Sequence, residues 1–150
     1  MEGETQGAAK TPAHVPIVGV LSLLWNSYGA YDYAMTQLKG DAYMQAAGMN
    51  AVQIAYVHTL PVWNTAAWAV GVWAGVLGSI LLLARSRFAV WAFAASLAGL
   101  VASLIHTYVV DQAASRAAGA QAPGFSAMLL AVCIGLLFYA ARVTRAGHLR

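Results

Sequence analysis

Four runs of apolar residues dominate this chain, and each is long enough to cross the roughly 30 Å hydrocarbon core of a bilayer. Their approximate bounds are 15–37, 62–84, 88–110 and 124–141. Of the 150 residues, 61% are hydrophobic and only 9% are charged, whereas about 25% charged residues is usual in a soluble domain. The sequence therefore predicts one all-α membrane domain over residues 15–141, folded as a four-helix transmembrane bundle.

The segments between the runs predict how the bundle is connected. A link of three residues, 85–87, forces the second and third helices into an antiparallel hairpin. Segment 41–60 is too polar to span, so we expect an amphipathic segment on the outer surface, broken near Gly48. With four spans, six basic residues fall on the side of both chain ends, and two fall on the other side. The positive-inside rule then places the tails 1–14 and 142–150, the second of them basic, in the cytoplasm.

The first run carries a polar stripe that should face other helices. At helical spacing, one face holds Ser22, Asn26, Gly29, Asp32 and Thr36. The opposite face holds Leu21, Leu24, Ala30 and Tyr31. A carboxylate near the centre of a spanning helix costs roughly 2.5–3.5 kcal/mol on insertion scales. We therefore expect the stripe to point into the bundle and not into lipid.

A polar cluster in the outer third of the bundle is the candidate site. Asp32 and His106 each lie about five residues before the outer end of parallel helices, and so at similar depth. Asn64 can approach that depth, and Asn26 and Tyr28 supply further polar groups. Three interpretations stay open. The cluster is a structural packing contact, or it is a ligand or proton site, or Asp32 and His106 do not meet.

Small residues indicate close helix packing. In the second run, Gly71 and Gly75 form a GxxxG pattern that Gly78 extends. Within the third run, the small or polar face holds Ala92, Ser96, Gly99, Ser103 and His106. The GxxxG face predicts packing between helices of one chain, or dimerisation of two chains.

Several functions find no support in the pattern. The hydrolase, metalloprotease and phosphate-loop motifs are missing, so the sequence does not predict an enzyme. The single cysteine, Cys133, excludes a disulfide within the chain and is expected to be a small buried hydrophobe. The tryptophans are expected to be interface anchors. We expect no metal, no cofactor and no nucleic acid. The expected partners are the lipid bilayer and either further copies of the chain or another protein of a membrane complex.

Residues 24–37, LWNSYGAYDYAMTQ, resemble the motif LWNxxGAxDYxMTQ of a family of small bacterial inner-membrane proteins with four spans. Residues 68–79, WAVGVWAGVLGS, also resemble that family, in the same order along the chain. The resemblance covers residues 15–108 and implies a multi-pass protein of the bacterial inner membrane. Some members carry the label "sugar transporter". Residues 49–63 depart from the family, whose members often have a Phe-rich segment with Pro-Glu there.

Three functional hypotheses follow. The first is a membrane accessory or scaffold protein whose polar seam is structural. The second is a small oligomeric transporter, or a proton-coupled carrier of a sugar or another small polar solute, that uses Asp32 and His106. The third is a membrane enzyme or redox subunit.

Overall fold

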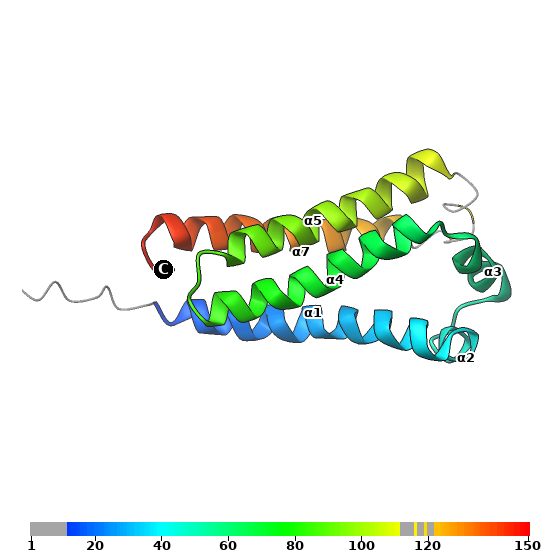
Figure 1. Ribbon diagram of the computed structural model, residues 1–150, viewed down its shortest axis with the longest axis horizontal. Helices are drawn as coiled ribbons and strands as arrows, with labels where there is room; N and C mark the ends of the chain where they lie inside the picture. The colour runs from blue at the N-terminus through cyan, green and yellow to red at the C-terminus, as the bar shows by residue number, and fades with distance from the viewer. Residues whose placement is uncertain (1–11, 112–115, 117–118, 120–121) are drawn as a thin grey trace, which may run out of the picture.

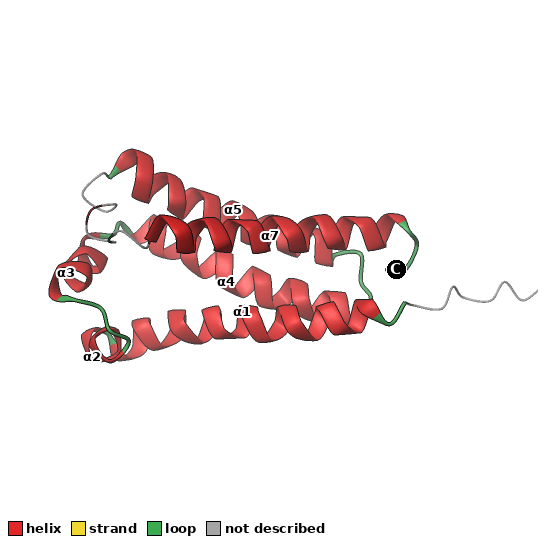
Figure 2. Ribbon diagram, turned by 180° about the vertical axis from the view of Figure 1, so that it is seen from behind, coloured by secondary structure: helices red, strands yellow, loops and turns green. Residues whose placement is uncertain are grey.

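The computed structural model describes residues 12–111, 116, 119 and 122–150, and within them every regular element is a helix (Figures 1 and 2). The helices are α1 (His14–Lys39), α2 (Asp41–Ala46), α3 (Ala51–Thr59), α4 (Val62–Leu83), α5 (Ala89–Ile105), the π-helical turn η1 (His106–Val110) and α7 (Ala122–Arg145). The predicted all-α class is confirmed for these residues. Most of the predicted tail 1–14 and of the segment 111–123 between the third and fourth apolar runs lies outside them.

Three of the described helices are long and apolar enough to cross a membrane by length and composition. They are Val62–Leu83, Ala89–Val110 and Pro123–Arg145. α1 is longer, at 26 residues, but it is not among the three, because polar side chains such as Asn26 and Asp32 lower its mean hydropathy. The chain therefore has the helices of a membrane protein, while a fourth span through α1 remains a prediction.

The four long helices pack in the order α1, α4, α5, α7 (Figures 1 and 2). The short link after α4 makes α4 and α5 an antiparallel pair, which is the most extensive interface of the fold. α1 lies against α4, and α7 lies against α5. α1 and α7 share no comparable interface, but they meet near the chain ends, where His14 Nδ1 and Tyr139 Oη lie 2.6 Å apart.

The main apolar core lies at the end of the bundle that holds both described chain ends. Its buried members are Val15, Leu82, Ala89, Phe93, Ala140, Val143 and Leu149. Residues 142–150, expected from the sequence to be a basic tail, are folded onto the bundle. α7 continues to Arg145, and Leu149, only 6% exposed, packs into this core. The Arg150 backbone N–H donates to Arg85 O (2.7 Å) and Arg150 O accepts from Arg87 N–H (2.8 Å), which pins the segment to the α4–α5 link.

Two short helices, α2 and α3, cover the other end of the bundle (Figure 1). The break expected near Gly48 is present, and Gly48 has a φ of +87°, a conformation that favours glycine. α3 begins with a reciprocal cap, in which the side chain of Asn50 accepts from Gln53 N–H and the side chain of Gln53 accepts from Asn50 N–H. His58 pairs with Asp41 at 2.7 Å, but both side chains are exposed, so the pair contributes little.

Candidate functional site

The side-chain amide of Asn26 ties α1 to α4. Its Nδ2 donates to the Ser22 carbonyl at 2.8 Å and to Ser79 Oγ at 3.2 Å. Ser79 is fully buried on α4 and donates its own proton to the carbonyl of Gly75 at 2.9 Å. The middle of the polar stripe therefore faces a neighbouring helix, and its groups are used in contacts within the chain.

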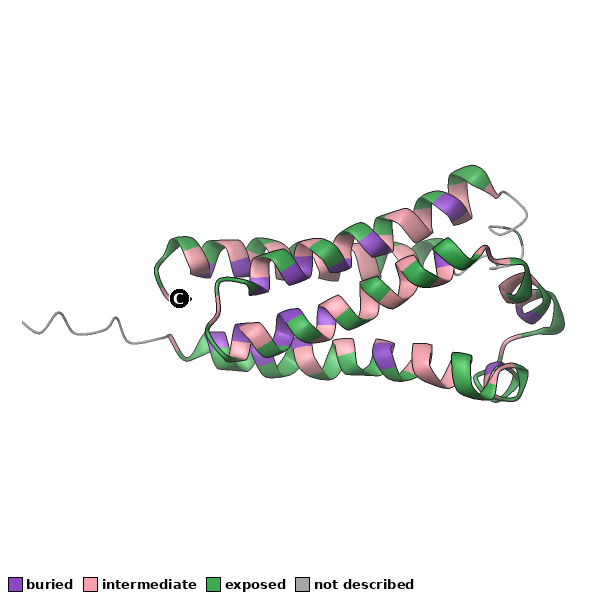
Figure 3. Cartoon of the chain, in the orientation of Figure 1, coloured by how far each residue is buried: buried purple, intermediate pink, exposed green. Residues whose placement is uncertain are grey.

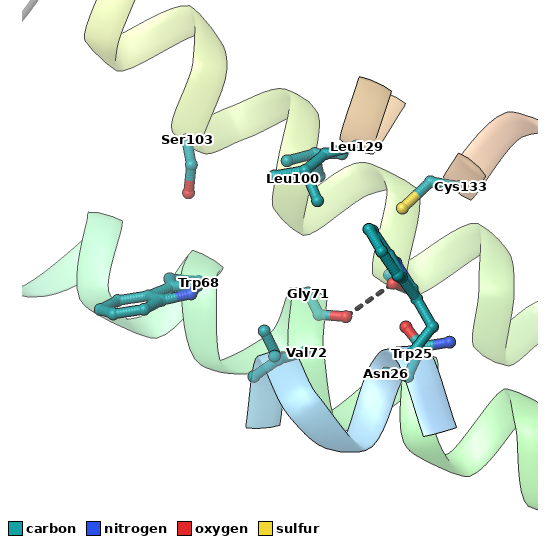
Figure 4. Close-up of a pocket in the computed structure, with 11 residues that line it drawn as sticks. Trp25, Asn26, Trp68, Gly71, Val72, Leu100, Ser103, Leu129 and Cys133 are labelled. Carbon is teal, nitrogen blue, oxygen red and sulfur yellow. Dashed lines mark hydrogen bonds between the residues drawn. The ribbon is translucent and has the colours of Figure 1, made fainter. Parts of the chain in front are cut away.

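The three glycines of the predicted packing face lie against neighbouring helices of the same chain. A Cβ added at Gly75 would overlap the Asn26 amide, and one at Gly78 would come within 2.9 Å of the Phe93 ring. The backbone of Gly71 lies on α5, where Ser96 Oγ donates to Gly71 O at 2.6 Å (Figure 4). These contacts form a seam of small residues through α1, α4 and α5.

Gly99 on α5 marks the closest approach of α4 and α5. A Cβ there would lie 2.5 Å from the carbonyl oxygen of Ala67 and 2.7 Å from the backbone nitrogen of Gly71. Both atoms are backbone, so no side-chain rotation can relieve the overlap. Only glycine fits this crossing at its present separation.

A cavity of about 130 Å³ lies midway along the bundle, between all four long helices (Figure 4). Its lining residues are Trp25, Asn26, Gly29, Trp68, Gly71, Val72, Ser96, Leu100, Ser103, Leu129 and Cys133. Trp25 and Trp68 line this space, although the sequence suggested only membrane-interface anchors. Cys133 is half-buried at its edge. The sequence could not predict this cavity, because a cavity arises where the side chains of several packed helices leave space unfilled.

The hydrogen-bond partner of Asp32 lies on α2 and not on α5. Tyr43 Oη donates a hydrogen bond to Asp32 Oδ1 at 2.9 Å. This bond, with smaller effects of desolvation and of the negative charge of Asp32, raises the pKa of Tyr43 to about 12. Asp32 therefore anchors α2 to the C-terminal part of α1.

His106 is 7% exposed and opens the π-helical turn that follows α5. Its ring packs edge-to-face on Trp63, with centroids 5.0 Å apart, and its Nδ1 has no hydrogen-bond partner. Asn64, the next residue of α4, is also buried. Among the described residues no hydrogen bond joins Asp32, Asn64 and His106. The described structure therefore shows no hydrogen bond within the predicted cluster, and Asp32 Oδ1 accepts from Tyr43 instead.

The face of α1 that packs on α4 also departs in part from the predicted stripe. Ala30, expected on the lipid side, is 5% exposed, whereas Tyr28, expected near the cluster, is 72% exposed. Tyr33 packs edge-to-face on Trp68, with centroids 4.9 Å apart. The contact face therefore runs through Asn26, Ala30 and Tyr33, which leaves Asp32 at its border.

No group of three or more His, Cys, Asp or Glu side chains that could hold a metal occurs among the residues that the structure describes. No family model, no curated protein and no solved structure matches the chain. The interior seam and the cavity are therefore interpreted from their own chemistry.

Proposed function

We propose that the chain is a four-span accessory or scaffold protein of the bacterial inner membrane, with both ends in the cytoplasm. The observation that carries this proposal is that polar side chains between α1, α4 and α5 are hydrogen-bonded to one another or to the backbone. Asn26 Nδ2 donates to two acceptors, Ser79 bridges it to α4, and Ser96 bonds the backbone of α4. A carrier needs polar groups that are free to exchange partners, whereas these groups hold helices together.

α1 supplies the fourth span in this proposal. Its 26 residues give a length of about 39 Å, enough to cross the hydrocarbon core. Its exposed face is mostly apolar or aromatic, with Leu21, Leu24 and Tyr31 all more than half exposed. Such a face suits lipid, while the polar stripe is largely covered by α4. The split of basic residues and the family resemblance support the same topology.

The proposal is tested by a double-mutant cycle across the α1–α4 contact. Asn26→Ala and Ser79→Ala, alone and together, are compared by equilibrium unfolding in mixed detergent micelles. A structural seam should give a coupling energy of about 0.6–1.7 kcal/mol, the range of interhelical hydrogen bonds in membrane proteins. Ser27→Ala, on the exposed side of α1, is the matched control and should change stability little. Additive effects of Asn26→Ala and Ser79→Ala would contradict a structural seam.

A proton-coupled carrier is the second candidate, and His106 is the observation that favours it. A buried imidazole with an unpartnered Nδ1, placed in a π-helical turn, has the features of a proton-transfer group. Protein reconstituted in liposomes with an internal pH dye distinguishes the two candidates. An accessory protein should give no more proton influx than empty liposomes when glucose is added. Influx that depends on glucose and is lost in His106→Gln would establish the carrier instead.

A further inference from the structure

One fully buried polar atom beside the cavity has no hydrogen-bond partner. Ser103 Oγ is fully buried and makes no hydrogen bond, although it lines the cavity from α5 (Figure 4). Two neighbouring donors are already engaged, since Ser96 Oγ bonds Gly71 and Asn26 Nδ2 bonds Ser22 and Ser79. An unsatisfied buried hydroxyl is costly, and a ligand that hydrogen-bonds to it would remove the cost.

The rest of the lining is apolar and aromatic. The indole of Trp68 lies on the α4 side, and Trp25 approaches from α1 toward Cys133 (Figure 4). Val72, Leu100 and Leu129 complete the walls. Indole rings bind an aromatic ligand well through stacked or edge-to-face contacts. Water is a less favourable occupant, because a buried water needs two to four polar partners and most of the lining is apolar or aromatic.

The volume of the cavity limits the size of the ligand. A dry cavity of about 150 Å³ holds one benzene molecule, and the present cavity is slightly smaller, at about 130 Å³. A sugar would bring several hydroxyls and leave most of them unpaired against these walls. The space is partly open, so one aromatic ring can enter it, and a single hydroxyl on the ring can pair with Ser103 Oγ.

A ligand can reach the cavity from the membrane between α1 and α7, the first and last of the four packed helices. α1 and α7 lack an extended interface, and both contribute to the cavity lining, α1 through Trp25 and α7 through Leu129 and Cys133. Trp25 is 40% exposed, so the cavity lies close to the lipid-facing surface there. A molecule that partitions into the bilayer can reach the cavity sideways.

We propose that this cavity is a binding site for a small neutral phenol, reached from the lipid phase between α1 and α7. The ring lies among Trp25, Trp68 and Leu100, and its hydroxyl hydrogen-bonds to Ser103 Oγ. The site borders the structural seam, with which it shares Asn26, Gly71 and Ser96, but it does not depend on the accessory role.

The test measures binding of 4-fluorophenol and of fluorobenzene to the protein in phosphatidylcholine nanodiscs by ¹⁹F NMR, with empty nanodiscs as the blank. Ser103→Ala should lower the affinity for 4-fluorophenol about three- to tenfold, which corresponds to one hydrogen bond, and should leave the affinity for fluorobenzene unchanged. Because both probes partition into lipid, the comparison between variants cancels that background. Cys133→Phe should fill the cavity and abolish binding of both probes. Ala131→Phe, on the exposed side of α7, should bind both normally.

Three results would overturn the proposal. The first is no binding above empty nanodiscs, as expected if a lipid acyl chain fills the cavity. The second is an equal affinity of wild type and Ser103→Ala for 4-fluorophenol, which would mean that the hydroxyl is not recognised. The third is undiminished binding to Cys133→Phe, which would place the probes elsewhere on the protein.

Discussion

A single methyl group at Gly99 should separate the two most closely packed helices of the fold. The added Cβ would lie 2.5 Å from Ala67 O and 2.7 Å from Gly71 N. Since both are backbone atoms, α4 and α5 would have to move apart by about half an ångström to bring even the shorter distance to 3.0 Å. The 2.6 Å hydrogen bond from Ser96 Oγ to Gly71 O crosses the same interface and would lengthen.

The magnitude follows from two opposing effects. Overpacking of this kind typically costs about 1–3 kcal/mol, through lost contacts along the whole interface. Replacing a helical glycine by alanine returns up to about 1 kcal/mol of helix propensity. With the middle value of each range, about 2 and about 0.5 kcal/mol, Gly99→Ala should lower the free energy of unfolding by about 1.5 kcal/mol.

The assay is equilibrium unfolding in mixed micelles, followed by circular dichroism, with two matched controls. Gly71→Ala places its Cβ 3.5 Å from Leu100 N, an ordinary contact, and Gly135→Ala has nothing within 4 Å. Both should be as stable as wild type or slightly more stable. If Gly99→Ala proved at least as stable as Gly71→Ala, the close crossing of α4 and α5 would be refuted.

Two further predictions concern the seam and the outer end. Gly75→Leu should lower the thermal unfolding temperature in detergent, since its side chain would displace the Asn26 amide. Val76→Leu, at the next position along the helix, should be tolerated. Equal unfolding temperatures of the two variants would contradict close packing at the seam. Because the pKa of Tyr43 is raised from 10.0 to about 12 in the folded protein, the stability supplied by its bond to Asp32 is present below pH 10 and is lost as the pH rises toward 12. The thermal unfolding temperature of wild type should therefore fall more steeply between pH 10 and pH 12 than that of Tyr43→Phe. If the two unfolding temperatures fell in parallel with pH, the bond would be contradicted.

The long helices and the packing glycines could be predicted because their signals are local. A run of about twenty apolar residues and a GxxxG spacing both act within one helix. The structure places α4 and α5 within one residue of the predicted runs, once η1 is counted with α5. Gly71, Gly75 and Gly78 lie in helix contacts for the same reason.

The polar cluster was harder to predict, because counting residues gives depth in the membrane but not direction around the helix. Asp32 and His106 were expected at one depth, but Asp32 lies at the border of the α1–α4 contact and bonds Tyr43. That tyrosine comes from α2, an element whose position no pattern in α1 reveals. Leu149 is similar, since a lone apolar residue among basic ones gave no sign that it packs into the core.

The central structural claim is that α1 crosses the membrane, and the sidedness of its two ends tests it most directly. In a Cys133→Ala background, Ala13→Cys and Lys39→Cys place one exposed thiol at each end of the helix. Intact bacterial cells expressing each variant are treated with a membrane-impermeant thiol reagent and scored for labelling before and after permeabilisation. A four-span bundle predicts that Lys39→Cys is labelled from outside and that Ala13→Cys is labelled only after permeabilisation. Labelling of both positions from the same side would contradict it and leave a protein of three spans.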